Sequence, residues 1–111
     1  MDQPIARESV LVQQADSSQI EVTIQIWPPH QDPERPGEWL CVTSLEPLYS
    51  KLGPARSDSA MQSLCLAVSH VFDLLHHEVE KGGSVKHLSG ERFPFEAYSY
   101  GVLAGEHRQI K

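Results

Sequence analysis

The segment 20–27, IEVTIQIW, constrains the fold more than any other part of the chain, because apolar residues alternate strictly with other residues along it. The four apolar residues on one side are Ile20, Val22, Ile24 and Ile26. A period of two residues is typical of a β-strand with one buried face and one solvent-exposed face. The segment 7–14, RESVLVQQ, is a second strand candidate, and the short turn-rich link between the two predicts an antiparallel hairpin.

Three further segments predict shorter strands, namely 38–45 (EWLCVTSL), 49–57 (YSKLGPARS) and 84–90 (SVKHLSG). The first of them should form a single strand, because its residues again fall on two alternating faces. Between the hairpin and this strand, 28–37 (PPHQDPERPG) contains four prolines and a glycine. Because proline cannot donate a backbone hydrogen bond, we expect this stretch to form an exposed and fairly stiff loop.

A long helix is predicted from about Ser59 to Glu80. Ser59 is a suitable N-cap, and Gln62 stands three residues later, where a capping box places a Glu or Gln side chain. Gly82 and Gly83 provide the stop signal after the last turn. The helix is therefore bounded at both ends by local sequence signals.

The apolar residues of this helix fill about half of its circumference at about 100° per residue. They are Met61, Leu64, Cys65, Ala67, Val68, Val71, Phe72, Leu74, Leu75 and Val79. An apolar arc of that width can lie flat across a sheet. The sequence therefore predicts an α+β fold, in which one long helix packs on one face of a mostly antiparallel sheet of four or five strands.

The chain of 111 residues is expected to form a single domain, with a core at 7–95 and a flexible tail at 101–111. Its two cysteines, Cys41 and Cys65, both stand among apolar residues. Such contexts favour buried free thiols over a disulfide. We therefore expect both thiols to lie in the core.

The net charge of −6 argues against a nucleic-acid partner, because phosphate binding requires clustered Lys and Arg. The acidic residues concentrate in two stretches, at 32–46 and at 58–80, with only Arg35 among them. An acidic surface attracts basic partners. No apolar run approaches the roughly 20 residues of a membrane helix, and the first ten residues lack the order of a signal peptide, so we expect a cytoplasmic protein with no membrane partner.

Three segments, GEWLC at 37–41, SAMQSLCLAV at 59–68 and LSGERFPF at 88–95, resemble a small bacterial family, a domain of unknown function. In that family a strand carrying Trp-x-Cys precedes a helix that opens with Gln-x-Leu. The matching positions here are Trp39, Cys41, Gln62 and Leu64, whereas Ser59 stands where the family usually has an acidic residue. The resemblance spans residues 7–95 and implies a shared fold. It implies no catalytic residue.

The helix carries one histidine-rich face, on which His70, Asp73 and His77 stand at positions i, i+3 and i+7. Three such side chains could bind a metal ion or perform acid–base chemistry. One helix rarely brings three ligands to one ion without help from another element, so a solvated polar face is the favoured interpretation. We predict no catalytic residue, no cofactor and no metal ion.

Protein binding is the favoured function, and its candidate residues are Leu66, His70, Asp73, His77, Glu80 and Trp27. Leu66 is an apolar residue amid the polar helix face, and Trp27 follows the alternating strand on its exposed side. We expect a non-enzymatic domain with an acidic surface, such as an immunity-type or chaperone-type partner of another protein. The alternative is a small metal-binding or acid–base enzyme domain that uses His70, Asp73 and His77. A homodimer through the open face or the edge of the sheet is compatible with either.

Overall fold

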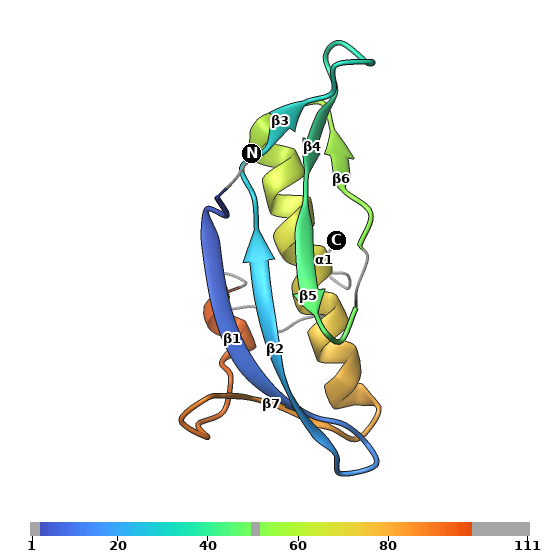
Figure 1. The fold of residues 1–111 in the computed structure, drawn as a ribbon. Helices are drawn as coiled ribbons and strands as arrows, with labels where there is room; N and C mark the ends of the chain where they lie inside the picture. The colour runs from blue at the N-terminus through green and yellow to red at the C-terminus, as the bar shows by residue number, and fades with distance from the viewer. Residues whose placement is uncertain (1–2, 50–51, 99–111) are drawn as a thin grey trace.

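A computed structural model describes residues 3–49 and 52–98, and Figure 1 shows one long helix packed behind a set of β-strands. The elements in chain order are β1 (Ala6–Gln13), β2 (Gln19–Ile26), β3 (His30–Gln31), β4 (Trp39–Cys41), β5 (Thr43–Glu46), β6 (Ala55–Ser57), α1 (Ala60–Glu80), β7 (Ser84–His87) and the 3-10 helix η1 (Phe95–Tyr98). The predicted α+β class is confirmed. The predicted tail at 101–111 lies outside the described residues.

The strands form two antiparallel sheets, a four-stranded sheet of order β5-β2-β1-β7 and a three-stranded sheet of order β3-β4-β6. The predicted hairpin is β1–β2, which pairs from Ala6 opposite Ile26 to Gln13 opposite Gln19. The prediction of a single strand at 38–45 was wrong. That segment divides at Val42 into β4 and β5, which belong to different sheets.

The division follows from one extra residue opposite Val42. Ile26 pairs with Thr43 and His30 pairs with Leu40, so one strand advances four residues while the other advances three. An additional residue on one side of an antiparallel pair is a β-bulge, which bends the ribbon and disrupts the ladder. The bulged side contains Pro28 and Pro29, which have no N–H to donate. The Pro-rich stretch therefore ends β2 and starts the short β3, which the sequence prediction placed in a loop.

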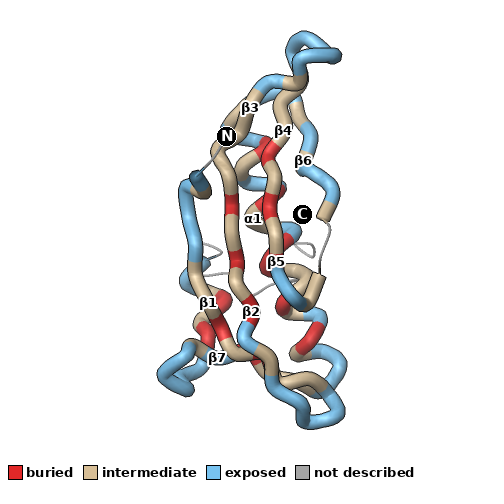
Figure 2. The backbone as a smooth tube through the Cα atoms, in the orientation of Figure 1, coloured by how far each residue is buried: buried red, intermediate tan, exposed pale blue. Residues whose placement is uncertain are grey.

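The main hydrophobic core lies between α1 and the inner face of the four-stranded sheet (Figure 2). Its buried residues are Val10, Val12, Val22, Ile24, Leu45, Val71, Phe72, Leu75, Val85, Phe93 and Phe95. The alternation predicted for β2 is confirmed, since Val22, Ile24 and Ile26 are all buried. A second, smaller cluster of Ile26, Cys41 and Ala67 lies where the first half of α1 meets β4.

Local signals define both ends of α1. The Gln62 N–H donates a hydrogen bond to Ser59 Oγ at 3.1 Å, which confirms Ser59 as the N-cap. In the second hydrogen bond of the predicted capping box, the Ser59 N–H would donate to the Gln62 side chain. It donates to Ser57 Oγ instead, at 3.4 Å. Gly82 follows the C-cap with a φ of 104°, a conformation that favours glycine.

The predicted apolar arc of α1 was partly wrong. Met61 is 72% exposed and Cys65 is also exposed, whereas Ser63 and Glu78 are buried. The C-terminal segment 93–98 packs against the second half of α1 and covers the apolar arc there. The centroids of the Phe72 and Tyr98 rings are 5.0 Å apart. Because this segment covers the second half of the helix, Met61 and Cys65 on the first half remain exposed.

The two thiols should therefore differ in reactivity. Cys65 is exposed and should react with a thiol reagent in native buffer at a rate close to that of an unfolded chain. Cys41 is fully buried, its Sγ donates to the Trp27 carbonyl oxygen at 3.4 Å, and burial raises the pKa of its thiol. We expect at least a hundredfold slower labelling of Cys41, measured by mass spectrometry with and without denaturant. Equal native rates would contradict the burial of Cys41.

Candidate protein-binding site

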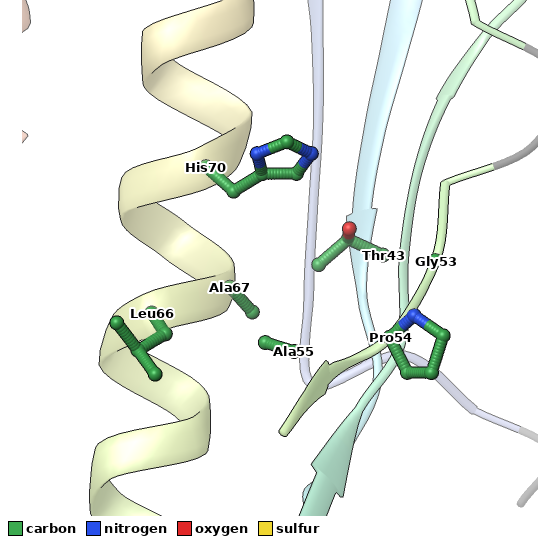
Figure 3. A pocket seen from close by; sticks show the side chains of 7 residues that line it. All are labelled: Thr43, Gly53, Pro54, Ala55, Leu66, Ala67 and His70. Atoms are coloured by element: carbon green, nitrogen blue, oxygen red, sulfur yellow. The ribbon is translucent and has the colours of Figure 1, made fainter. Parts of the chain in front are cut away.

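A pocket of about 270 Å³ opens between α1 and the chain that leads into β6 (Figure 3). It is lined by Thr43, Gly53, Pro54, Ala55, Leu66, Ala67 and His70. Three of these residues come from α1, one comes from β5, and three come from β6 and the residues immediately before it. The pocket therefore lies between the helix and the junction of the two sheets, where β5 of one sheet and the start of β6 of the other approach α1.

The pocket exists because the pairing of β4 with β6 stops early. The last pair of that ladder is Cys41 with Ala55, so the same register would next place Val42 opposite Pro54 and Thr43 opposite Gly53. Pro54 has no N–H, and a proline ends a ladder at this point. Beyond it β5 and the chain before β6 diverge, and the small side chain of Ala67 on α1 leaves the space between them open.

The pocket is lined by both polar and apolar groups, and its polar side chains are Thr43 and His70. Figure 3 shows the His70 ring extending from α1 toward the strand that carries Thr43, while Ala67 and Ala55 point toward one another. Leu66 is 44% exposed at the rim, and Thr43 is buried. The volume is below the roughly 300–1,000 Å³ of pockets that enclose a small molecule. A space of this size has room for an apolar side chain.

The structure brings only two of the candidate residues from the sequence into this pocket, Leu66 and His70. His77 and Glu80 lie further along α1, where His77 Nδ1 is 3.7 Å from Glu80 Oε1. Asp73 is partly buried on the same helix, and none of these three lines the pocket. Trp27 is partly buried after β2, and its N–H donates to the Val42 carbonyl oxygen.

Sequence reasoning missed the pocket residues that α1 faces. Gly53, Pro54 and Ala55 lie within a segment predicted only as a short strand. Pro54 was the available signal, because a proline next to a short strand marks the point where pairing stops. Recognising a pocket there also required the position of α1, which no local pattern provides.

The histidine-rich face of α1 does not form a ligand set in the structure. Among residues 3–49 and 52–98, no group of three or more His, Cys, Asp or Glu side chains is placed to hold a metal ion. His76 contributes an edge-on contact to Phe95, with ring centroids 5.3 Å apart. His76 thus packs against Phe95, whereas His70 points to the pocket.

The acidic stretches are less uniform than the sequence indicated, because basic residues from elsewhere pair with them. Arg56 Nη1 lies 3.1 Å from Asp32 Oδ2 and 2.7 Å from Glu38 Oε1. Hydrogen bonds from the Glu34 N–H and from Arg56 hold the pKa of Asp32 below its ordinary value. Arg35 is the only basic residue within these stretches of the sequence, and Arg56 joins it from a distant position.

Glu78 belongs to the acidic stretch at 58–80, from which an acidic surface was expected, but it does not contribute to that surface. Its side chain is 2% exposed, and its Oε2 lies 3.1 Å from Lys81 Nζ. Glu80 remains exposed but is accompanied by His76, whose Nδ1 is 3.6 Å from Glu80 Oε2. The end of α1 therefore presents one accessible carboxylate rather than two.

Within the part of the chain that the structure describes, no helix combines the length and the hydropathy required to cross a lipid bilayer. Comparison of the chain with protein-family models, with curated proteins and with solved structures finds no match.

Proposed function

We propose that the chain is a cytoplasmic, non-enzymatic protein-binding domain whose contact site is the pocket at Leu66 and His70. The observation that carries the proposal is an exposed leucine at the rim of a pocket with room for one apolar side chain. Protein interfaces concentrate binding energy where an apolar anchor enters such a pocket and excludes water. The lining offers no pair of groups for acid–base catalysis, which further supports binding over chemistry.

The proposed partner is a basic protein that presents an apolar side chain, in the manner of an immunity-type or chaperone-type interaction. The net charge of −6 supports this choice, since a negative field speeds the approach of a positively charged partner. The pairing of Asp32 and Glu38 with Arg56 reduces the charge of the loop at 32–38. We therefore attribute the long-range attraction of the basic partner to the net charge of the chain, and the specific contact to the pocket.

Site-specific crosslinking in the native host tests this proposal. A photoreactive amino acid at His70 should capture one defined protein, whereas the same group at Leu88, which is 53% exposed on another surface, should not. With that partner purified, Leu66→Asp should raise the dissociation rate about tenfold or more, because it places a charge at a buried contact. Surface-plasmon kinetics measure the rate, and Leu88→Asp serves as the matched control.

Equal capture from positions 70 and 88 would count against the pocket as a contact site. Unchanged dissociation of Leu66→Asp would do the same, provided that its circular dichroism and thermal midpoint match those of the unmodified chain. If Leu66→Asp and Leu88→Asp raise the dissociation rate equally, the cause is a general surface effect, and this result also contradicts the proposal.

A further inference from the structure

The outer face of the four-stranded sheet is not covered by any element among the described residues. Figures 1 and 2 look onto this face, with α1 behind the strands. The core residues of each strand point to α1, so the residues between them point outward. Ser9 and Thr23 lie on this outer face, and their hydroxyl oxygens are 3.4 Å apart across β1 and β2.

Charges of opposite sign occupy opposite halves of this outer face. Glu21 on β2 and Glu46 on β5 lie on one half, and Arg7 on β1 and Lys86 on β7 lie on the other. All four are exposed, and none of them forms an ion pair with another residue that the structure describes. Leu11 stands between Glu21 and Lys86 as the directly paired residue of both.

We propose that this outer face binds a second copy of the chain, with the two sheets face to face. The two-fold axis would run parallel to the strands, between β1 and β2. Rotation about that axis places β1 of one copy over β2 of the other, and β7 of one copy just beyond the Glu46 end of β5 of the other, because β7 pairs with residues 10–13 of β1 and β5 pairs with residues 23–26 of β2. The basic half of each copy therefore meets the acidic half of the other, an isologous arrangement.

The strand register specifies which side chains would meet. Leu11 of one copy would lie about 4.8 Å, one strand spacing, from Leu11 of the other when both are projected onto the face. Lys86 of the second copy would fall about one strand spacing from Glu21 and about two residues along the strand from Glu46. Ser9 would lie over Thr23 of the other copy. These small side chains permit the spacing of about 10 Å at which sheets stack.

The arrangement of charges selects a second copy over an unrelated partner. A partner with one sign of charge would be attracted by only half of this face and repelled by the other half. The face is nevertheless small, roughly 14 Å by 26 Å for a width of three strands and a length of eight residues, against about 800 Å² per copy in stable interfaces. We therefore expect a weak, reversible and salt-sensitive dimer that leaves the α1 pocket free.

Charge exchange tests the dimer directly. The acidic half is reversed in one variant, Glu21→Lys with Glu46→Lys, and the basic half is reversed in another, Arg7→Glu with Lys86→Glu. Sedimentation velocity of the unmodified chain at about 1 mM and low ionic strength should show dimers, and salt should dissociate them. Each variant alone should associate at least tenfold more weakly, because its face then carries one sign of charge. An equimolar mixture of the two should recover the dimer.

A cysteine at the axis provides an independent measurement. Leu11→Cys in a Cys65→Ser background should be joined to a second copy by a short bismaleimide that reaches across sheets stacked about 10 Å apart, whereas Glu46→Cys, which the axis moves to the far edge, should not. Circular dichroism and thermal midpoints verify that each variant is folded. A monomeric unmodified chain overturns the proposal, as do a mixture that stays monomeric, association that both reversed variants retain, and equal crosslinking from positions 11 and 46.

Discussion

Replacing Gly83 with alanine is expected to lower the free energy of unfolding by about 3 kcal/mol, a large effect for one methyl group. A Cβ at Gly83 would lie 2.1 Å from the Gln13 carbonyl oxygen and 2.9 Å from the Glu78 carbonyl oxygen. Both are backbone atoms that pairing holds in place. The Gly83 N–H donates to Glu78 O at 2.9 Å, and the next residue, Ser84, pairs with Gln13.

Urea unfolding followed by circular dichroism measures this effect. Gly53→Ala is the matched control, since a Cβ at Gly53 would meet no atom within 4 Å and its φ is not positive. The control should stay within about 1 kcal/mol of the unmodified chain. Similar unfolding midpoints for the two variants would contradict the close approach of the helix end to β1.

Replacing Phe93 with alanine should cost about 3–5 kcal/mol, as is typical of a large aromatic residue removed from a core. Phe93 is 1% exposed, and its ring lies 5.1 Å from Phe95, 5.8 Å from Phe72 and 4.9 Å from Tyr98. Its removal leaves a cavity and also separates the C-terminal segment from α1. The packing of the second half of the helix depends on that segment.

Thermal unfolding with near-ultraviolet circular dichroism measures the Phe93→Ala effect, because the aromatic signal reports the packing of these rings. Leu88→Ala is a suitable control, since Leu88 is 53% exposed and should change the free energy of unfolding by about 0.5 kcal/mol or less. A Phe93→Ala variant that unfolds with the midpoint of the control would show that 91–98 does not belong to the core.

Features that depend on neighbouring residues could be predicted from the sequence. The hairpin followed from the alternation at 20–27, and the start of α1 followed from Ser59, whose side chain bonds the Gln62 N–H. The β7 strand likewise follows the glycine stop of the helix. In each case the periodicity or the cap is local, so a single sequence contains the required information.

Features that depend on distant segments could not be predicted in the same way. The arc of α1 changes between Cys65 and Phe72 because residues 93–98 cover only part of the helix. Arg56 reaches Asp32 across 24 positions of the chain, which a local count of charges cannot detect. The pocket itself combines Pro54 with Leu66 and His70, and only the packing of α1 on the sheets brings them together.

The division of the core into two clusters has a consequence for how the molecule opens. Stability is not uniform along a fold, and regions with fewer buried apolar contacts unfold locally at lower free energy. The pocket shares Ala67 with the smaller cluster, whose other buried members among the described residues are Ile26 and Cys41. The first half of α1 thus buries fewer apolar side chains than the second half. A side chain that enters the pocket adds apolar contacts at that end, so binding there would also protect the helix against local opening.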